Sequence, residues 1–122
     1  MYELTVETSF SSAHNLRGYE GACENLHGHN WKVEAHLTAS RLNDIGMVVD
    51  FKLIKNELKK IIEKLDHKYL NEVPPFDKDN TTAENIARFI FRELSSAFED
   101  GNVRLSKVRV WESENSAAAY SE

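Results

Sequence analysis

The chain has 122 residues, of which 41% are hydrophobic and 29% are charged, and its formal net charge is −5. This composition is typical of an ordinary globular protein, and the length predicts a single domain over residues 1–122. The acidic balance argues against general affinity for nucleic acid, and no apolar run approaches the roughly 20 residues that cross a bilayer. We therefore expect neither a nucleic acid nor a membrane as a partner.

The single cysteine, Cys23, cannot form a disulfide within the chain. This is the simpler match to a reducing compartment, so we expect a cytoplasmic protein. Glu3 and Glu7 interrupt the first apolar alternation, and we therefore expect no signal peptide at this end of the chain.

Alternating apolar and polar residues predict a first strand over Tyr2–Phe10 that runs on to His14. A loop rich in glycine and asparagine is expected over Asn15–Asn30, followed by a second alternating strand over Trp31–Ala39. Two such strands predict an antiparallel hairpin. His14 would then lie at the same end of the hairpin as the start of the second strand.

The other predicted elements are a helix from its N-cap Asp50 to Leu65, a loop over Asp66–Asn80, a helix to Phe98, and strands Val103–Trp111 and Ser116–Tyr120 around a turn at 112–115. Thr81 and Glu84 have the spacing of a capping box at the start of the second helix. The order ββααββ predicts an α+β fold, an antiparallel four-stranded sheet with two helices on one face. Pairing between subunits can cover the open sheet edges, so we expect a homo-oligomer.

Three histidines are candidate metal ligands. His27 and His29 form a His-Gly-His step, and residues two apart on an extended chain project to the same side. Gly28 between them would let an ion approach the backbone. With His14 they would make a three-nitrogen site with one open position, the usual pattern of catalytic zinc. The alternative is that the three are ordinary polar loop residues.

Cys23 and the pair Asp66–His67 are candidates for proton transfer. A loop cysteine near Zn²⁺ has its thiolate favoured, so Cys23 could act as a general base, as a fourth metal ligand, or simply as a small buried hydrophobe. Asp66 and His67 follow the first helix, where a carboxylate and an imidazole can orient one another for acid–base chemistry. Their alternative role is a helix C-terminus with a favourable histidine.

Glu112 follows an apolar strand and needs a partner if it is buried. It could bind the planar N–H edge of a pterin or guanine ring with both oxygens, or pair with Arg109 or a lysine. The start of the second helix, with Thr82 and Glu84, could place free backbone N–H groups over a ligand or serve only as a cap. His36 lies on the polar side of its strand and is expected to be exposed or substrate-facing.

Together these residues resemble the 6-pyruvoyltetrahydropterin synthase and 6-carboxytetrahydropterin synthase family along essentially the whole chain. The segments that carry the resemblance, in order, are Phe10–His14, Cys23–Asn30, Met47–Phe51, Leu65–His67, Thr82–Ala87 and Trp111–Ser113. One departure concerns the entry to the second helix, where Thr81 stands at a position that is often proline in the family.

The resemblance implies a tunnelling fold, in which ββααββ subunits close into an oligomeric β-barrel, commonly a hexamer with active sites between subunits. The roles it implies are Zn²⁺ binding by His14, His27 and His29, proton transfer by Cys23, Asp66 and His67, and anchoring of a pterin ring by Glu112, with Thr82 and Glu84 near that ring. The implied partner is a small pterin triphosphate.

Three residues separate Cys23 from His27, as in bacterial 6-carboxytetrahydropterin synthases, whereas animal 6-pyruvoyl enzymes have a longer spacer. By resemblance this favours a lyase of queuosine (7-deazaguanine) biosynthesis, which converts 7,8-dihydroneopterin triphosphate to 6-carboxy-5,6,7,8-tetrahydropterin, acetaldehyde and triphosphate. One alternative is 6-pyruvoyltetrahydropterin formation, without carbon–carbon cleavage. Another is a non-catalytic zinc-binding assembly module, closed by Cys23 as a fourth ligand.

Overall fold

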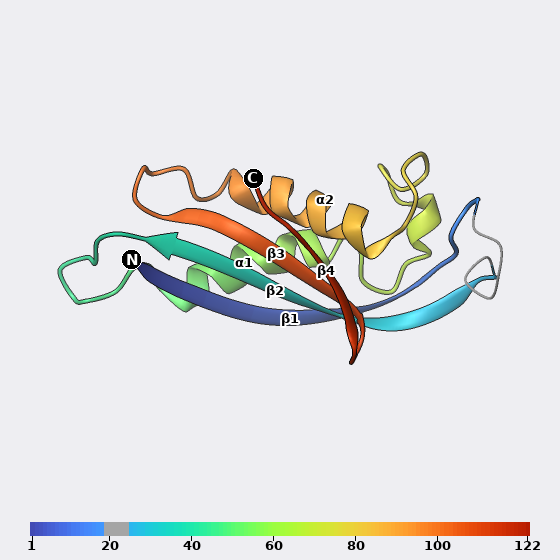
Figure 1. Ribbon diagram of the computed structural model, residues 1–122, viewed down its shortest axis with the longest axis horizontal. Helices are drawn as coiled ribbons and strands as arrows, with labels where there is room; N and C mark the ends of the chain where they lie inside the picture. Colours follow the sequence, from blue (N-terminus) through green and yellow to red (C-terminus); the bar gives the residue numbers. More distant parts are fainter. Residues whose placement is uncertain (19–24) are drawn as a thin grey trace.

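The computed structural model describes residues 1–18 and 25–122 and has one four-stranded antiparallel sheet in this part of the chain. Its strands lie side by side in the order β1 (Tyr2–His14), β2 (His27–Ala39), β3 (Arg104–Ser113) and β4 (Ser116–Tyr120) (Figure 1). The helices are α1 (Phe51–Ile62) and α2 (Ala83–Ser95), with a short 3-10 turn η2 (Leu70–Glu72) between them. The expected α+β fold with the order ββααββ is confirmed.

One face of the sheet is buried under the two helices. In β2 every second residue from Trp31 to Ala39 is at most 1% exposed, as expected for the core face of a pleated strand. The amphipathic helices supply the other half of this core. Their buried apolar residues are Ile54, Leu58, Ile61 and Ile62 of α1 and Ala83, Ile86, Ala87, Ile90, Phe91 and Leu94 of α2.

The second strand begins earlier than its sequence predicts. β1 continues to His14, and each of its residues from Tyr2 onward has a partner in β2, so the ladder reaches back to His27. The predicted loop over Asn15–Asn30 is therefore wrong in its last four residues. His27 and His29 belong to a regular strand, which holds them more firmly than a loop would.

Both helices end about one turn before their predicted last residues. α1 stops at Ile62 and α2 at Ser95, although Leu65 and Phe98 are still buried, at 0% and 7% exposure. Apolar periodicity reports burial, and it continues into non-helical turns that pack on the same core.

The two helix N-caps differ in how well the sequence predicts them. Asp50 accepts a hydrogen bond from the Lys52 backbone N–H at 2.9 Å, as expected. The capping box of Thr81 and Glu84 is wrong, because Thr82 is the N-cap and accepts from the Asn85 N–H at 3.1 Å. The Thr81 hydroxyl instead donates to the Asn15 carbonyl at 3.1 Å.

The sheet has two edges, β1 and β4. The end of β1 is partly covered, since the Ala13 N–H donates to the Lys68 carbonyl at 3.0 Å and Ala13 forms a parallel bridge with Tyr69. No helix among the described residues has both the length and the apolar composition needed to span a bilayer.

Candidate metal centre

Strand register brings the three predicted histidines together at one end of the sheet. His14 lies directly opposite His27, and Ser12 lies opposite His29. His14, His27 and His29 share the helix-covered face with the buried Trp31, because side chains two residues apart in a strand point the same way. β1 and β2 extend past β3 at this end (Figure 1), since the β2–β3 pairing starts at Lys32.

The three imidazole rings form a compact cluster. The ring centroids of His14 and His27, and those of His27 and His29, are 4.6 Å apart, and those of His14 and His29 are 5.0 Å apart. Trp31 lies behind them, with its ring 4.9 Å from that of His14 and 5.1 Å from that of His29. The indole supports the cluster from the core side.

Glu112 joins this cluster from β3. Val110 pairs with Val33, so Glu112 falls on the same face, beside the end of β2. One of its carboxylate oxygens is 3.1 Å from His29 Nε2 and 3.9 Å from His14 Nε2. One ligand atom from each of the three histidines and Glu112 lies within 4.8 Å of the others. This group has the composition of a metal site.

The sequence does not place Glu112 beside the histidines. The turn expected over 112–115 is wrong at Glu112, because this residue lies within β3. Its binding of a ring stays a prediction. Its alternation with Val108 and Val110 is the signal that puts it on the helix-covered face. The alternation does not predict how close β3 lies to the hairpin of β1 and β2, because that distance depends on the tertiary fold.

The hydrogen bonds of the rings suit metal binding. His14 Nδ1 is 2.8 Å from the Thr81 carbonyl and His27 Nδ1 is 2.6 Å from the Asn25 carbonyl. Because a carbonyl only accepts, each Nδ1 carries the hydrogen and each Nε2 keeps its lone pair. His14 Nε2 and His29 Nε2 are buried without a hydrogen-bond partner among the described residues, and the 3.1 Å contact of Glu112 lacks hydrogen-bond geometry. A metal ion would satisfy both atoms.

Burial keeps two of the imidazoles neutral. It lowers the pKa of His14 from its ordinary value, opposed by the hydrogen bond to Thr81 and reinforced by the other two histidines. Burial also lowers the pKa of His29, while the Glu112 carboxylate opposes that change. A neutral imidazole is the form that binds a metal, so protons compete weakly at these two ligands.

The predicted role of Gly28, to let an ion approach the backbone, is wrong. It is exposed, and a Cβ added to it would have no atom within 4 Å. Because it alternates with His27 and His29, its missing side chain would lie on the opposite face of β2 from the imidazoles. Close approach of an ion to the backbone therefore gives no reason for glycine here.

Asp66 and His67 lie apart from the histidine cluster, on the edge of β1 that does not pair with β2. Asp66 Oδ1 accepts from the Ser11 backbone N–H at 2.9 Å, and this hydrogen bond is the main cause of its lowered pKa. His67 Nδ1 is 3.0 Å from the same oxygen, and its side chain is 83% exposed. Asp66 and His67 therefore contact each other, and among the described residues neither contacts the histidine cluster.

Thr82 caps α2, and Glu84 lies in the first turn of this helix. Glu84 and Glu112 share a hollow of about 170 Å³ with Ala83 and with Ser116, Ala117 and Ala118 of β4. Pockets for drug-sized ligands commonly measure about 300–1,000 Å³. The hollow brings two of the predicted substrate-binding residues together, but it is small for a pterin.

Cys23 and His36 are the two other residues singled out in the sequence. Cys23 lies outside the described residues. His36 is 7% exposed, so the expectation of an exposed side chain is wrong. On the sheet face opposite the helices, its Nδ1 is 3.1 Å from Thr5 Oγ1 and 3.6 Å from a Glu3 oxygen, which explains how a polar strand position becomes buried.

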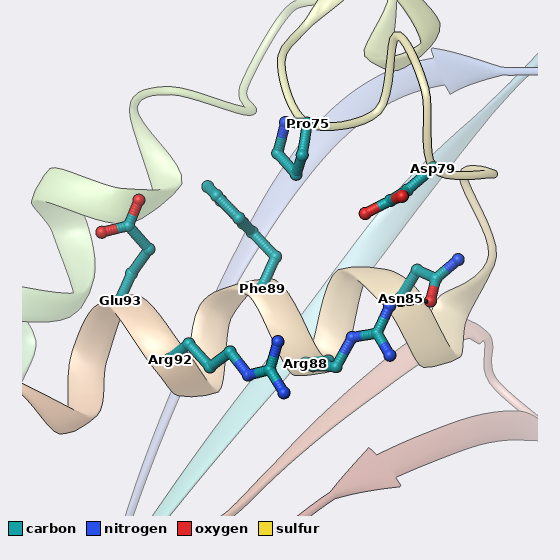
Figure 2. Close-up of a pocket in the computed structure, with 7 residues that line it drawn as sticks. All are labelled: Pro75, Asp79, Asn85, Arg88, Phe89, Arg92 and Glu93. Carbon is teal, nitrogen blue, oxygen red and sulfur yellow. Dashed lines mark hydrogen bonds between the residues drawn. The ribbon is translucent and has the colours of Figure 1, made fainter.

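A larger cavity of about 340 Å³ lies on the outer side of α2, away from the predicted residues (Figure 2). Its lining is Pro75, Asp79, Asn85, Arg88, Phe89, Arg92 and Glu93. Arg92 is held by Tyr120 and Glu122, and Arg88 donates to Asn85 at 2.9 Å. No histidine lines this cavity, so it is distinct from the candidate metal centre.

The lowered histidine pKa values predict a pH-dependent stability for the metal-free protein. The unfolded chain has imidazoles near the ordinary pKa of 6.5, and the folded chain has lower values at His14 and His29. The unfolded state therefore binds more protons just below pH 6.5, and the free energy of unfolding should fall as the pH decreases through that region. Urea denaturation of chelator-treated protein at pH 7.5 and 5.5 measures this change.

The matched comparison for that measurement is His14→Gln, which removes one of the two imidazoles with a lowered pKa. It should reduce the difference in unfolding free energy between the two pH values. An unchanged difference would contradict the assignment of the effect to His14. Asp66 titrates in a separate window, because its lowered pKa removes stability only as the pH falls below its ordinary 3.8.

Comparison with known proteins places this geometry in a family. The family model of 6-pyruvoyl tetrahydropterin synthase matches residues 3–122. A 6-carboxy-5,6,7,8-tetrahydropterin synthase of Synechocystis is 37% identical to this chain, over 98% of this chain and 93% of its own length. A 6-pyruvoyl tetrahydrobiopterin synthase of Dictyostelium discoideum is 36% identical, over 96% of this chain and 93% of its own length.

The fold matches as well as the sequence does. The solved structure of Caenorhabditis elegans 6-pyruvoyl tetrahydropterin synthase has a TM-score of 0.85 and 29% identity, covering 100% of this chain and 97% of that chain. Sequence and fold thus agree over nearly the full length of both partners in each comparison. The chain belongs to the 6-pyruvoyl tetrahydropterin synthase family.

Proposed function

We propose that the chain is a zinc-dependent lyase that converts 7,8-dihydroneopterin triphosphate to 6-carboxy-5,6,7,8-tetrahydropterin. One water is consumed, and acetaldehyde and triphosphate are released. The observation that carries the proposal is the convergence of His14, His27 and His29 beside the Glu112 carboxylate. The Nε2 atoms of His14 and His29 are buried and have no hydrogen-bond partner in the part of the chain that the structure describes. Neutral nitrogen ligands in this number are typical of catalytic zinc.

The three histidines would hold Zn²⁺, which as a bound Lewis acid makes protons next to the side-chain oxygens of the substrate more acidic. Glu112 would accept two N–H bonds from the pterin ring edge, by the geometry that makes arginine–carboxylate pairs bidentate. Cys23 would remove a side-chain proton, and the Asp66–His67 pair would return protons. The exposure of His67 suits exchange of that proton with water.

We propose that this site is completed in a homo-oligomer, with the hexamer favoured by resemblance. Two observations support the assembly. The hollow beside Glu112 is about 170 Å³ within one chain, and the exposed His67 lies with Asp66 on the edge of β1 that does not pair with β2. A neighbouring subunit could enlarge the hollow and bring an Asp66–His67 pair to it, since paired edges place residues of two chains side by side.

The carboxy product is favoured by spacing, because three residues separate Cys23 from His27. The distance along the chain limits how far a base on that loop can reach over the substrate side chain. A relative named as a 6-carboxytetrahydropterin synthase is 37% identical to this chain, and one named as a 6-pyruvoyl tetrahydrobiopterin synthase is 36% identical. Sequence identity to these two therefore does not show which product this chain forms. The pyruvoyl activity is therefore the second candidate. Queuosine (7-deazaguanine) biosynthesis and a cytoplasmic location remain predictions, as does a single domain over residues 1–122.

The product assay tests the reaction directly. Zinc-loaded protein incubated with 7,8-dihydroneopterin triphosphate should release acetaldehyde in equal amount to the 6-carboxy product, followed by enzymatic aldehyde detection and mass spectrometry. Chelator-treated protein is the control and should leave the substrate unchanged. Pyruvoyl product without acetaldehyde would select the second candidate, and an untouched substrate with loaded protein would contradict both.

Replacement of Cys23 separates an enzyme from a zinc-binding assembly module. Cys23→Ala should keep its zinc and lose turnover by a factor of about 100 or more, the usual contribution of a general base. Zinc content by atomic absorption and turnover of the same sample give the two readings. Loss of zinc with loss of the oligomer would indicate instead that the thiolate closes a structural site.

Replacement of Glu112 distinguishes ring anchoring from metal ligation. Glu112→Gln should raise KM by about 10- to 100-fold, because charged hydrogen bonds contribute about 1.5–3 kcal/mol, while the zinc dissociation constant stays near the original value. Glu114→Gln, two residues away and exposed, is the matched control and should change neither quantity. Weaker zinc binding with an unchanged KM would assign Glu112 to the metal.

A further inference from the structure

Two buried polar residues lie directly behind His14 and contact none of the other predicted ligands. Thr81 is 0% exposed and Asn71 is 8% exposed, in a core that is otherwise almost entirely apolar. Burying a polar side chain costs free energy unless its hydrogen bonds are made. Their side-chain hydrogen bonds go to Asn15, the residue that follows His14, or join the two residues to each other, and the Thr81 carbonyl accepts from His14.

The first contact acts on the ring of His14. Its Nδ1 donates to the Thr81 carbonyl at 2.8 Å. This bond fixes which nitrogen carries the hydrogen and fixes the rotation of the ring, so that Nε2 presents its lone pair toward His29 and Glu112. The position of the Thr81 carbonyl therefore decides where one metal ligand points.

The second set of contacts acts on the backbone next to His14. The Asn71 side chain donates to the Asn15 carbonyl at 2.9 Å and accepts from the Asn15 N–H at 3.1 Å. We call this pair of bonds the Asn71 clip. It holds the backbone N–H and carbonyl of Asn15, the residue that follows His14, and so limits movement at the end of β1.

The Thr81 hydroxyl connects the two sets. It lies 3.1 Å from the Asn15 carbonyl and 3.3 Å from Asn71 Oδ1, which are two atoms of the clip. Thr81 therefore contacts the clip with its hydroxyl and the His14 ring with its carbonyl. Tyr69 adds a further bond, from its hydroxyl to Asn15 Oδ1 at 2.6 Å. Ring and backbone of His14 are thus fixed by one connected network.

We propose that Asn71 and Thr81 are positioning residues of the metal centre, holding His14 in the orientation and tautomer in which it binds the metal. This inference rests on the proposed zinc function of the three histidines. It adds residues that act through His14 and Asn15 rather than as ligands themselves. Hydrogen-bonded partners of ligating histidines typically change metal affinity by about 10- to 100-fold when they are mutated.

The chain contains a matched control for the Asn71 clip. Asn102 accepts from the Arg41 N–H at 3.1 Å and donates to the Arg41 carbonyl at 3.0 Å, so it makes the same pair of bonds to one backbone residue. It joins the loop after β2 to the loop before β3, at the end of the sheet opposite the histidines. A purely structural effect of losing a clip should appear equally in both variants.

The test measures the zinc dissociation constant of the full chain by competition with a chromophoric chelator. Asn71→Ala and Thr81→Val should weaken zinc binding by about 10- to 100-fold. Thr81→Ser, which keeps the hydroxyl, should bind like the original chain, and so should Asn102→Ala. Absorption of the Co²⁺-substituted proteins should change in Asn71→Ala and Thr81→Val and stay unchanged in the two controls.

Equal zinc affinity and equal Co²⁺ spectra in Asn71→Ala, Thr81→Val and Asn102→Ala would overturn the inference. If Asn71→Ala does not fold, Thr81→Val still decides, because it removes only the hydroxyl and keeps the side-chain shape. A different result would contradict the proposed zinc function itself. The unsubstituted chain would bind no zinc, or the His29→Ala variant would bind zinc as tightly as the unsubstituted chain.

Discussion

The candidate site depends on the register between β1 and β2, in which His14 lies directly opposite His27. A shift of one residue would move every side chain of one strand to the other face of the sheet. The core enforces this register, because Trp31 is fully buried two residues after His29 on the same face of β2. The apolar core and the imidazole cluster are therefore successive parts of a single face, and stabilising the first positions the second.

Electrostatics and hydrogen bonding prepare the same three rings for a metal. Burial lowers the pKa of His14 and His29 and keeps them neutral, and backbone carbonyls occupy Nδ1 of His14 and His27. What remains is a set of Nε2 atoms directed at one another. Such an arrangement is unfavourable for the free protein, since two of these atoms have no hydrogen-bond partner among the described residues. Binding of a cation relieves that cost.

The predicted acid–base residues are positioned differently from the candidate metal ligands. The candidate ligands project from paired strands, whereas Asp66 and His67 follow α1 and lie on the edge of β1 that does not pair with β2. His67 has a positive φ of 56°, an uncommon backbone conformation for a residue other than glycine. Its side chain is 83% exposed, as the proposed role at a contact between subunits requires.

Local patterns in the sequence predict the element types, the two amphipathic helices and the grouping of His14, His27 and His29, because period-two and helical periodicities are properties of neighbouring residues. Four other features follow only from the folded chain: the start of β2, the burial of His36, the meeting of Glu112 with the imidazoles, and the network of Asn71 and Thr81. Each of these depends on distances between segments far apart in the chain, where strand pairing and packing choose among partners that local patterns leave equivalent.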